Sequence, residues 1–392
     1  MQCKLVWGFV LIAAGLVCGC EGGNYEYSPP ATYLRQPLPG TVLNAPRMSP
    51  ELRQQVLALD PDRLTDRDVQ QVLSRCPAPR IINIHGGTAL VALQMKSFSS
   101  FLVEMGYPSR QIRHPVSGAY SFSCYGTSGR IAGLVSWYYE REALRPMLIG
   151  HSQGGMEAVK VLHQLAGSYG RNKRVYNPMV GRFERRNWIL DPYIGKRVAV
   201  VDTVQVCFAS AVGAGGLTRL LPNQWNLAGK LRDIPDSAID FTGFYIPGDL
   251  LGSDLLGLAG NAYRATGRAK VRTVLLPLGH DHYFVPGTAY LGDDPDARRW
   301  ISEYQITQDE GTMTAPAGPA PNIVWAAEMW ASVRKHWCLE VQRMVRAQQE
   351  GHYAGAVAGQ GGGGVGVGTA VLDSGDAQRP TSAPADRAVA QP

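Results

Sequence analysis

The chain has 392 residues, of which 45% are hydrophobic, so it can form one large domain or two smaller ones. The formal net charge is +6, and residues 171–197 alone hold eight Lys or Arg against two acidic residues, so the rest of the chain sums to about zero. Such a basic segment could lie against anionic lipid or bind an acidic substrate. Nucleic acid is not an expected partner, because the chain begins like an exported protein.

The first residues are typical of an export signal. Lys4 precedes an apolar run over residues 5–17, which is too short to span a bilayer. The run ends in VCGC (17–20), which resembles the lipobox of bacterial lipoproteins, in which a Cys after small and apolar residues becomes lipid-modified. The alternatives are an ordinary secretory signal or an uncleaved anchor.

This resemblance implies a signal peptide over residues 1–19 and lipidation of Cys20, because Gly19 is the small residue expected before the cleavage point. Acyl chains on Cys20 would tether the protein to a membrane without a spanning helix. Glu21 stands where an Asp would mark inner-membrane lipoproteins. The resemblance therefore implies the bacterial cell envelope, at the outer membrane and facing the periplasm.

The composition predicts the domain organisation. Residues 20–50 are rich in Pro, Gly and Tyr and are typical of a linker, residues 51–350 form the folded domain, and residues 351–392 are a Gly-rich, disordered tail. Within the domain, the basic segment 171–197 is an insertion. We interpret it as a solvated surface, a lid over an acyl pocket, or a surface that lies against lipid headgroups.

Strands and helices alternate along the domain. Helical signals dominate residues 49–75, and apolar runs bounded by Gly and Pro predict the later elements. The expected strands cover residues 80–87, 145–150, 201–212, 240–248 and 270–279, and the expected helices cover 96–107, 129–144, 156–167 and 323–349. This alternation predicts an α/β fold with a mainly parallel sheet flanked by helices, followed by a C-terminal helix.

Four cysteines remain beyond the N-terminal region, and none of them has the spacing of a metal or haem site. They are Cys76, Cys124, Cys207 and Cys338. One or two disulfides are compatible with an oxidising periplasm, but the sequence does not give the pairing. Cys207 lies in an apolar strand and is expected to be a buried thiol.

The stretch LIGHSQGGMEA (148–158) contains the pattern Gly150-x-Ser152-x-Gly154 between a predicted strand and a predicted helix. A serine on such a sharp turn needs small neighbours, because strand and helix must approach closely. The N-terminus of the following helix would favour an anion that develops near Ser152. The context therefore indicates that Ser152 is a nucleophile.

Residues 79–290 resemble the α/β-hydrolase family, with the character of a serine esterase or lipase. GHSQGG (150–155) is the specific motif, and NIHGGTA (83–89) is similar to the family's oxyanion loop. The resemblance implies that the backbone N–H groups of Gln153 and Gly87 stabilise an oxyanion, with Thr88 as an alternative to Gly87.

The family's chain order of Ser, acid and His implies the other two catalytic residues. Asp249 follows a strand and a glycine and is the expected acid, with Asp254 as the alternative. Asp202 and Asp240 lie at the start of strands, which is the wrong edge of the sheet.

Two histidines near the last strand are candidates for the base. Gly279-His280 matches the family's common Gly-His spacing, which favours His280, and His282 is the alternative. His85 and His151 flank the site, whereas His163 is expected to be a packed or surface residue of the third helix.

These features predict a serine carboxylic-ester hydrolase that acts on lipid or lipid-like esters through an acyl-enzyme, with no metal or organic cofactor. An acyltransferase with the same triad is one alternative, and a non-catalytic envelope lipoprotein on a hydrolase scaffold is the other. The sequence does not give the oligomeric state.

Overall fold

The centre of the protein is a six-stranded parallel sheet. The structure is a computed structural model, which describes residues 48–252, 262–306 and 322–350. The strand order is β12-β10-β8-β3-β1-β2, and every neighbouring pair is parallel. The strands are β1 (Ile81–His85), β2 (Phe122–Ser123), β3 (Met147–His151), β8 (Val206–Val212), β10 (Ala238–Tyr245) and β12 (Lys270–Leu275).

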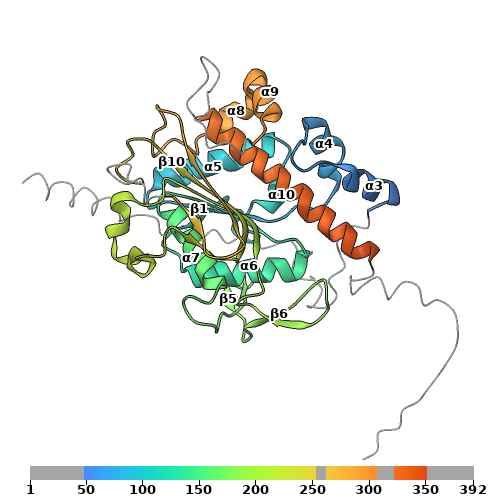
Figure 1. Ribbon diagram of the computed structural model, residues 1–392, viewed down its shortest axis with the longest axis horizontal. Coiled ribbons are helices and arrows are strands. Elements are labelled where there is room, and N and C mark those ends of the chain that lie inside the picture. The colour runs from blue at the N-terminus through green and yellow to red at the C-terminus, as the bar shows by residue number, and fades with distance from the viewer. Residues whose placement is uncertain (1–47, 253–261, 307–321, 351–392) are drawn as a thin grey trace, which may run out of the picture.

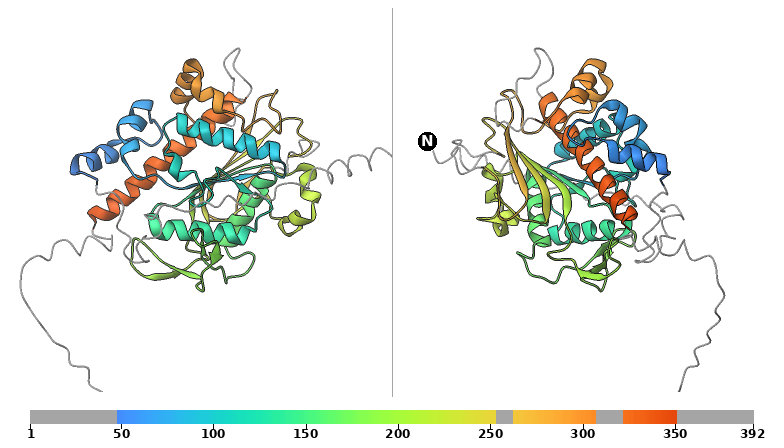
Figure 2. Two further views of the ribbon diagram at one scale, coloured as in Figure 1. Left: turned by 180° about the vertical axis from the view of Figure 1, so that it is seen from behind. Right: turned by 45° about the vertical axis from the view of Figure 1, so that its right-hand side comes forward.

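Helices cover both faces of this sheet, which confirms the predicted α/β fold. Figure 1 shows α6 and α7 on one face and α5 with α10 on the other, and Figure 2 shows α3 and α4 beside α10. The helices are α3 (Pro50–Ala58), α4 (Asp66–Gln71), α5 (Ala89–Glu104), α6 (Ser128–Glu142), α7 (Gln153–Leu165), α8 (Ala289–Asp293), α9 (Pro295–Glu303) and α10 (Ile323–Gln349).

The central strands β1, β3 and β8 are buried on both faces, and alternate residues enter two different cores. In β1, Ile81 packs with α5 and α10, whereas Ile82 packs with α6 and α7. Met147 and Leu148 of β3 divide in the same way, because successive side chains of a strand point to opposite faces. This explains why the strands are near-continuous apolar runs.

Two helices begin earlier than predicted, and both begin at the same edge of the sheet. α5 starts at Ala89, where the Thr88 side chain accepts a hydrogen bond from the N–H of Val91. α7 starts at Gln153, directly after Ser152. The long polar loop before α6 also contributes the short edge strand β2, which the sequence analysis did not predict.

The basic insertion packs against the outer side of α6. It forms two small antiparallel hairpins, β4 (Tyr176–Asn177) with β5 (Arg182–Phe183) and β6 (Trp188–Leu190) with β7 (Arg197–Ala199), which lie beyond α6 in Figure 1. Arg186 pairs through both of its terminal nitrogens with the fully buried Glu140 of α6, at 2.5 and 2.6 Å. Arg186 therefore anchors this segment to α6, and the described hydrogen bonds and ion pairs of the segment include none with Ser152. The lid interpretation stays a prediction.

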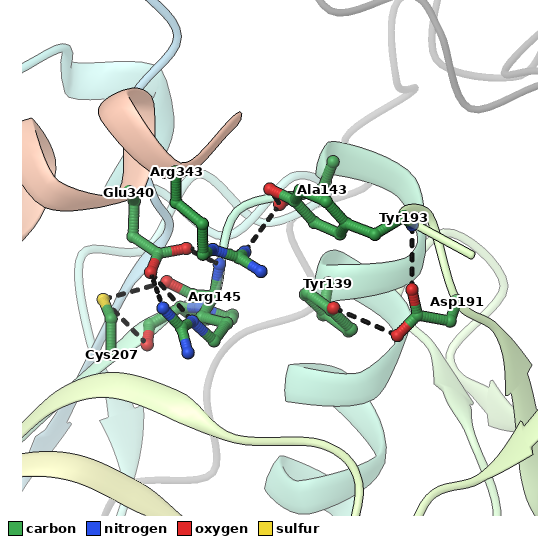
Figure 3. A network of polar contacts seen from close by, with 9 residues as sticks. Tyr139, Ala143, Arg145, Asp191, Tyr193, Cys207, Glu340 and Arg343 are labelled. Atoms are coloured by element: carbon green, nitrogen blue, oxygen red, sulfur yellow. Dashed lines mark hydrogen bonds and ion pairs between the residues drawn. The ribbon is translucent and has the colours of Figure 1, made fainter. Parts of the chain in front are cut away.

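A polar network ties α10 to the sheet and to the insertion (Figure 3). Glu340, whose side chain is 1% exposed, accepts from Arg145 just before β3 at 2.5 Å and from Arg343 at 2.8 Å. Arg343 also donates to the carbonyl of Ala143, and Tyr193 of the insertion donates to the same carbonyl at 2.7 Å. This network fixes the C-terminal helix across the end of α6.

The four cysteines of the domain are buried free thiols. Cys207 lies in β8, as predicted, and its Sγ donates to the carbonyl of Arg145 at 3.0 Å. The predicted signal peptide, most of the linker and the tail lie outside the described residues, as does Cys20. Within the described ranges, no helix is long and apolar enough to cross a membrane.

Candidate active site

Ser152 lies between β3 and α7 in a strained backbone conformation. Its φ is 56° and its ψ is −126°, a region that residues with a side chain rarely adopt. Its N–H donates to the carbonyl of Val212 at the end of β8, at 2.9 Å, which holds the turn against the sheet. The side chain is thereby raised above the carboxyl edge of the sheet, at the N-terminus of α7.

Three glycines allow this turn. A Cβ on Gly150 would lie 2.2 Å from the carbonyl oxygen of Gly154, and one on Gly154 would lie 2.1 Å from the carbonyl oxygen of Ile84. A Cβ on Gly155 would lie 2.8 Å from the Cβ of Ala214. Because backbone atoms cannot yield as a flexible side chain does, the requirement for small residues that the sequence predicted is confirmed.

Gly154→Ala should therefore destabilise the fold. The added Cβ overlaps backbone, so we expect a loss of about 3 kcal/mol or more in the free energy of unfolding, at the upper end of overpacking effects. Gly129→Ala is the matched control, because Gly129 is helical and has open space at its Cβ position, and the change should be neutral or slightly stabilising. Urea unfolding of the two variants checks this, and equal midpoints would contradict it.

His282 connects Ser152 to Asp249. The Ser152 hydroxyl donates to His282 Nε2 at 2.9 Å, and His282 Nδ1 donates to Asp249 Oδ2 at 2.6 Å. The three residues are 5%, 7% and 8% exposed, so they are sheltered yet reachable from solvent. A serine, an imidazole and a carboxylate in one hydrogen-bonded line form the arrangement of a catalytic triad.

Asp249 follows β10, as predicted, and its carboxylate is fixed by the turn after it. Oδ1 accepts from the N–H groups of Leu251 and Gly252 at 2.9 and 3.0 Å, which leaves Oδ2 for the imidazole. A Cβ on Gly252 would lie 2.6 Å from Oδ2, and one on Gly213 would lie 3.1 Å from His282 Nδ1. Glycine at these positions lets the acid and the imidazole approach the end of β8. The alternative acid, Asp254, lies outside the described residues.

The structure corrects the choice of base, because His280 does not contact Ser152. Its Nδ1 donates to the carbonyl of Pro277 at 2.8 Å, and its Nε2 is buried without a partner among the described residues. Burial lowers its pKa, partly offset by that hydrogen bond. Gly279 has a φ of 98° and turns the loop, and it is the imidazole of His282, three residues after this glycine, that reaches Ser152.

His151 holds the backbone of His282 in position. It is fully buried, and its Nε2 donates to the backbone carbonyl of His282 at 2.6 Å. Burial, with the neighbouring His282 as a second cause, lowers the pKa of His151 to about 3, so the ring stays neutral and keeps one N–H. The sequence analysis placed His151 beside the site without this role, and its position directly before Ser152 was the available signal.

The predicted oxyanion donors lie beside Ser152. Gln153 is the first residue of α7, and its N–H, like that of Gly87, donates no hydrogen bond within the described part of the chain. A Cβ on Gly86 would lie 2.9 Å from the Cβ of Ser152, so the glycine loop after β1 abuts the serine. Thr88 instead caps α5 through its side chain.

The remaining predicted histidines have structural contacts. His85 Nδ1 donates to the carbonyl of Gly86 at 2.8 Å. His163 of α7 contacts Ser168 Oγ and the carbonyl of Lys230, both at 3.1 Å, as expected for a packed residue. Across the described residues, no group of three His, Cys, Asp or Glu side chains could hold a metal ion.

Comparison with known proteins adds no assignment: no protein-family model matches this chain, and no curated protein matches it.

Proposed function

We propose that the protein is a serine carboxylic-ester hydrolase with an α/β-hydrolase type of fold. The observation that carries this proposal is the continuous line Ser152–His282–Asp249, with two contacts of 2.9 and 2.6 Å. The strained turn at Ser152 supports it independently, as do the N–H groups of Gln153 and Gly87, which donate to no other group of the described residues.

The chemistry follows from this geometry. His282 Nε2 takes the proton of Ser152 as Oγ attacks an ester carbonyl, and Asp249 holds the imidazole with its proton on Nδ1. The N–H groups of Gln153 and Gly87 stabilise the oxyanion, each worth on the order of 10²–10³ in rate. His282 then protonates the leaving alcohol, and a water molecule that it activates hydrolyses the acyl-enzyme.

Exposed apolar side chains support lipid or lipid-like esters as substrates. They follow four parallel strands, and the carboxyl ends of such strands meet at one edge of the sheet, where Ser152 lies. These side chains are Leu90 and Leu93 after β1, Leu217, Leu220 and Trp225 after β8, Leu250 after β10, and Leu278 and Phe284 after β12. Exposed apolar residues gathered at one edge are typical of a surface that meets an apolar partner. Tethering through Cys20 in the cell envelope remains part of this proposal.

Asp249→Asn tests the proposal at a buried acid that contacts His282 and does not touch the substrate. An amide cannot hold the reactive tautomer of His282, so kcat should fall by about 10⁴ while the fold is retained. The measurement is hydrolysis of p-nitrophenyl esters of increasing chain length, with circular dichroism to verify folding. Asp254→Asn is the control, and a larger loss in that variant would overturn the assignment of the acid.

A further inference from the structure

A polar pocket lies beside α7, next to the candidate active site. Its volume is about 460 Å³, within the range of about 300–1,000 Å³ that is usual for small-molecule sites. Its walls come from the residues before and at the start of α6, from one face of α7, and from residues 173, 223 and 226. Nothing in the proposed reaction on Ser152 uses it.

The α7 wall of this pocket carries charged and polar groups that are almost fully buried. Glu157 and Lys160 pair at 3.1 Å with side chains only 3% and 4% exposed, and Lys160 also donates to the carbonyl of Asn223 at 2.6 Å. Gln164 donates to Ser128 Oγ at 2.9 Å, yet its buried Oε1 has no partner in the described part of the chain. Buried groups of this kind are costly unless they serve a structure or a ligand.

The end of the pocket nearest Ser152 is formed by Cys124 and Tyr125. Tyr125 donates to the carbonyl of Gly87 at 3.1 Å, and Cys124 Sγ donates to Gln153 Oε1 at 3.7 Å. Gly87 and Gln153 are the two oxyanion residues, so a single layer of side chains separates them from the pocket. Glu157 follows Gln153 by four residues, which is about 6 Å along the helix. The pocket therefore begins about one helical turn from Gln153, on residues that contact both oxyanion residues.

The charges of the pocket select its ligand. An anion would face the carboxyl group of Glu157. Burial raises the pKa of this group, and the charge of Lys160 partly opposes the shift. A cation would face Lys160 and Lys173. A neutral ligand with many hydroxyl groups satisfies both signs, because each hydroxyl donates to one group and accepts from another. The ring of Tyr125, 51% exposed at the pocket, offers a flat apolar surface of the kind on which a sugar ring stacks.

We propose that this pocket binds the sugar of an acylated sugar, so that the ester cleaved at Ser152 joins an acyl chain to a sugar hydroxyl. This inference rests on the proposed hydrolase function. The ester C–O bond breaks as the Ser152 Oγ–acyl bond forms, and the serine proton passes through His282 to the sugar oxygen. Water then releases the carboxylic acid and restores the serine.

Two measurements on the full chain test the inference. Saturation-transfer NMR with methyl glycosides of glucose, galactose and mannose should show binding, which Lys173→Met and Gln164→Leu weaken by about fivefold, as expected for one lost hydrogen bond. The ratio of KM for 6-O-octanoylglucose to KM for methyl octanoate should rise by about the same factor. Lys196→Met, an exposed residue of the basic insertion, is the matched control and should change neither value.

The outcomes separate the two proposals. If the protein hydrolyses esters but binds no glycoside, the sugar pocket is overturned and the hydrolase stands. The same holds if both variants leave glycoside binding and the KM ratio unchanged. If the protein binds glycosides and the variants weaken this binding, but the protein hydrolyses no ester, the pocket is supported and the hydrolase is overturned. Thermal melts of both variants verify that any loss comes from a folded protein.

Discussion

Replacing His282 with Ala should reduce ester hydrolysis by on the order of 10⁴–10⁶ in kcat, because the members of a triad act as one unit. His282 is the only described side chain that contacts both Ser152 Oγ and Asp249 Oδ2. Without it, the hydroxyl has no base within hydrogen-bond distance and the carboxylate has no imidazole to orient. Steady-state hydrolysis of p-nitrophenyl butyrate measures the loss.

His280→Ala is the matched control for this prediction. It removes a hydrogen bond to the carbonyl of Pro277, worth about 1 kcal/mol, and should keep kcat within about tenfold of the unmodified protein. A loss in His280→Ala that exceeds the loss in His282→Ala would contradict the site and restore the choice that the Gly-His spacing favoured.

Replacing Glu340 with Gln should destabilise the domain by about 3 kcal/mol, the lower end for a broken buried ion pair. Glu340 is 1% exposed and receives Arg145 and Arg343, whose side chains are 19% and 28% exposed and can recover part of their hydration. Urea unfolding at neutral pH measures the loss. Glu303→Gln, on the exposed end of α9, is the control and should change stability by less than about 0.5 kcal/mol.

The effect of Glu340 should depend on pH. Burial alone would raise its pKa, but the charges of Arg343 and Arg145 outweigh burial and hold the pKa below its ordinary value. A depressed folded-state pKa gives stability that is present above the unfolded value of about 4.3 and is lost as pH falls through the folded-state pKa. The stability gap between the unmodified protein and Glu340→Gln should therefore narrow below about pH 4, and a gap that widened there would contradict this account.

Local patterns in the sequence were sufficient for much of the fold and for part of the site. The central strands β1, β3 and β8 are buried on both faces, so they appear as mainly apolar runs in the sequence. The turn at Ser152 was also predictable, because the clashes that exclude a Cβ at Gly150 and Gly154 involve backbone close by in the turn or in the adjacent strand. Asp249 was predictable because it comes shortly after β10, at the carboxyl edge of the sheet.

The base was not predictable, because the loop holds two histidines, His280 and His282, with a single residue between them. Which imidazole reaches Ser152 depends on the backbone turn at Gly279 and on the hydrogen bond from His151 to the carbonyl of His282. No local sequence pattern predicts the direction of this turn or the partner of His151. The packing of the basic insertion against α6 was likewise not predictable from the sequence. It depends on Glu140, a buried carboxylate on a helix more than thirty residues earlier, which anchors Arg186.

The most direct test of the central claim is intact-mass measurement of the protein after reaction with a fluorophosphonate probe. An activated serine attacks phosphorus as it would an ester carbonyl, so we expect one adduct that maps to Ser152 and is absent in Ser152→Ala. His282→Ala should slow the labelling, whereas His280→Ala should not. An unlabelled but folded protein, with or without detergent, or an adduct at another serine, would contradict the assignment of Ser152, His282 and Asp249 as a catalytic triad.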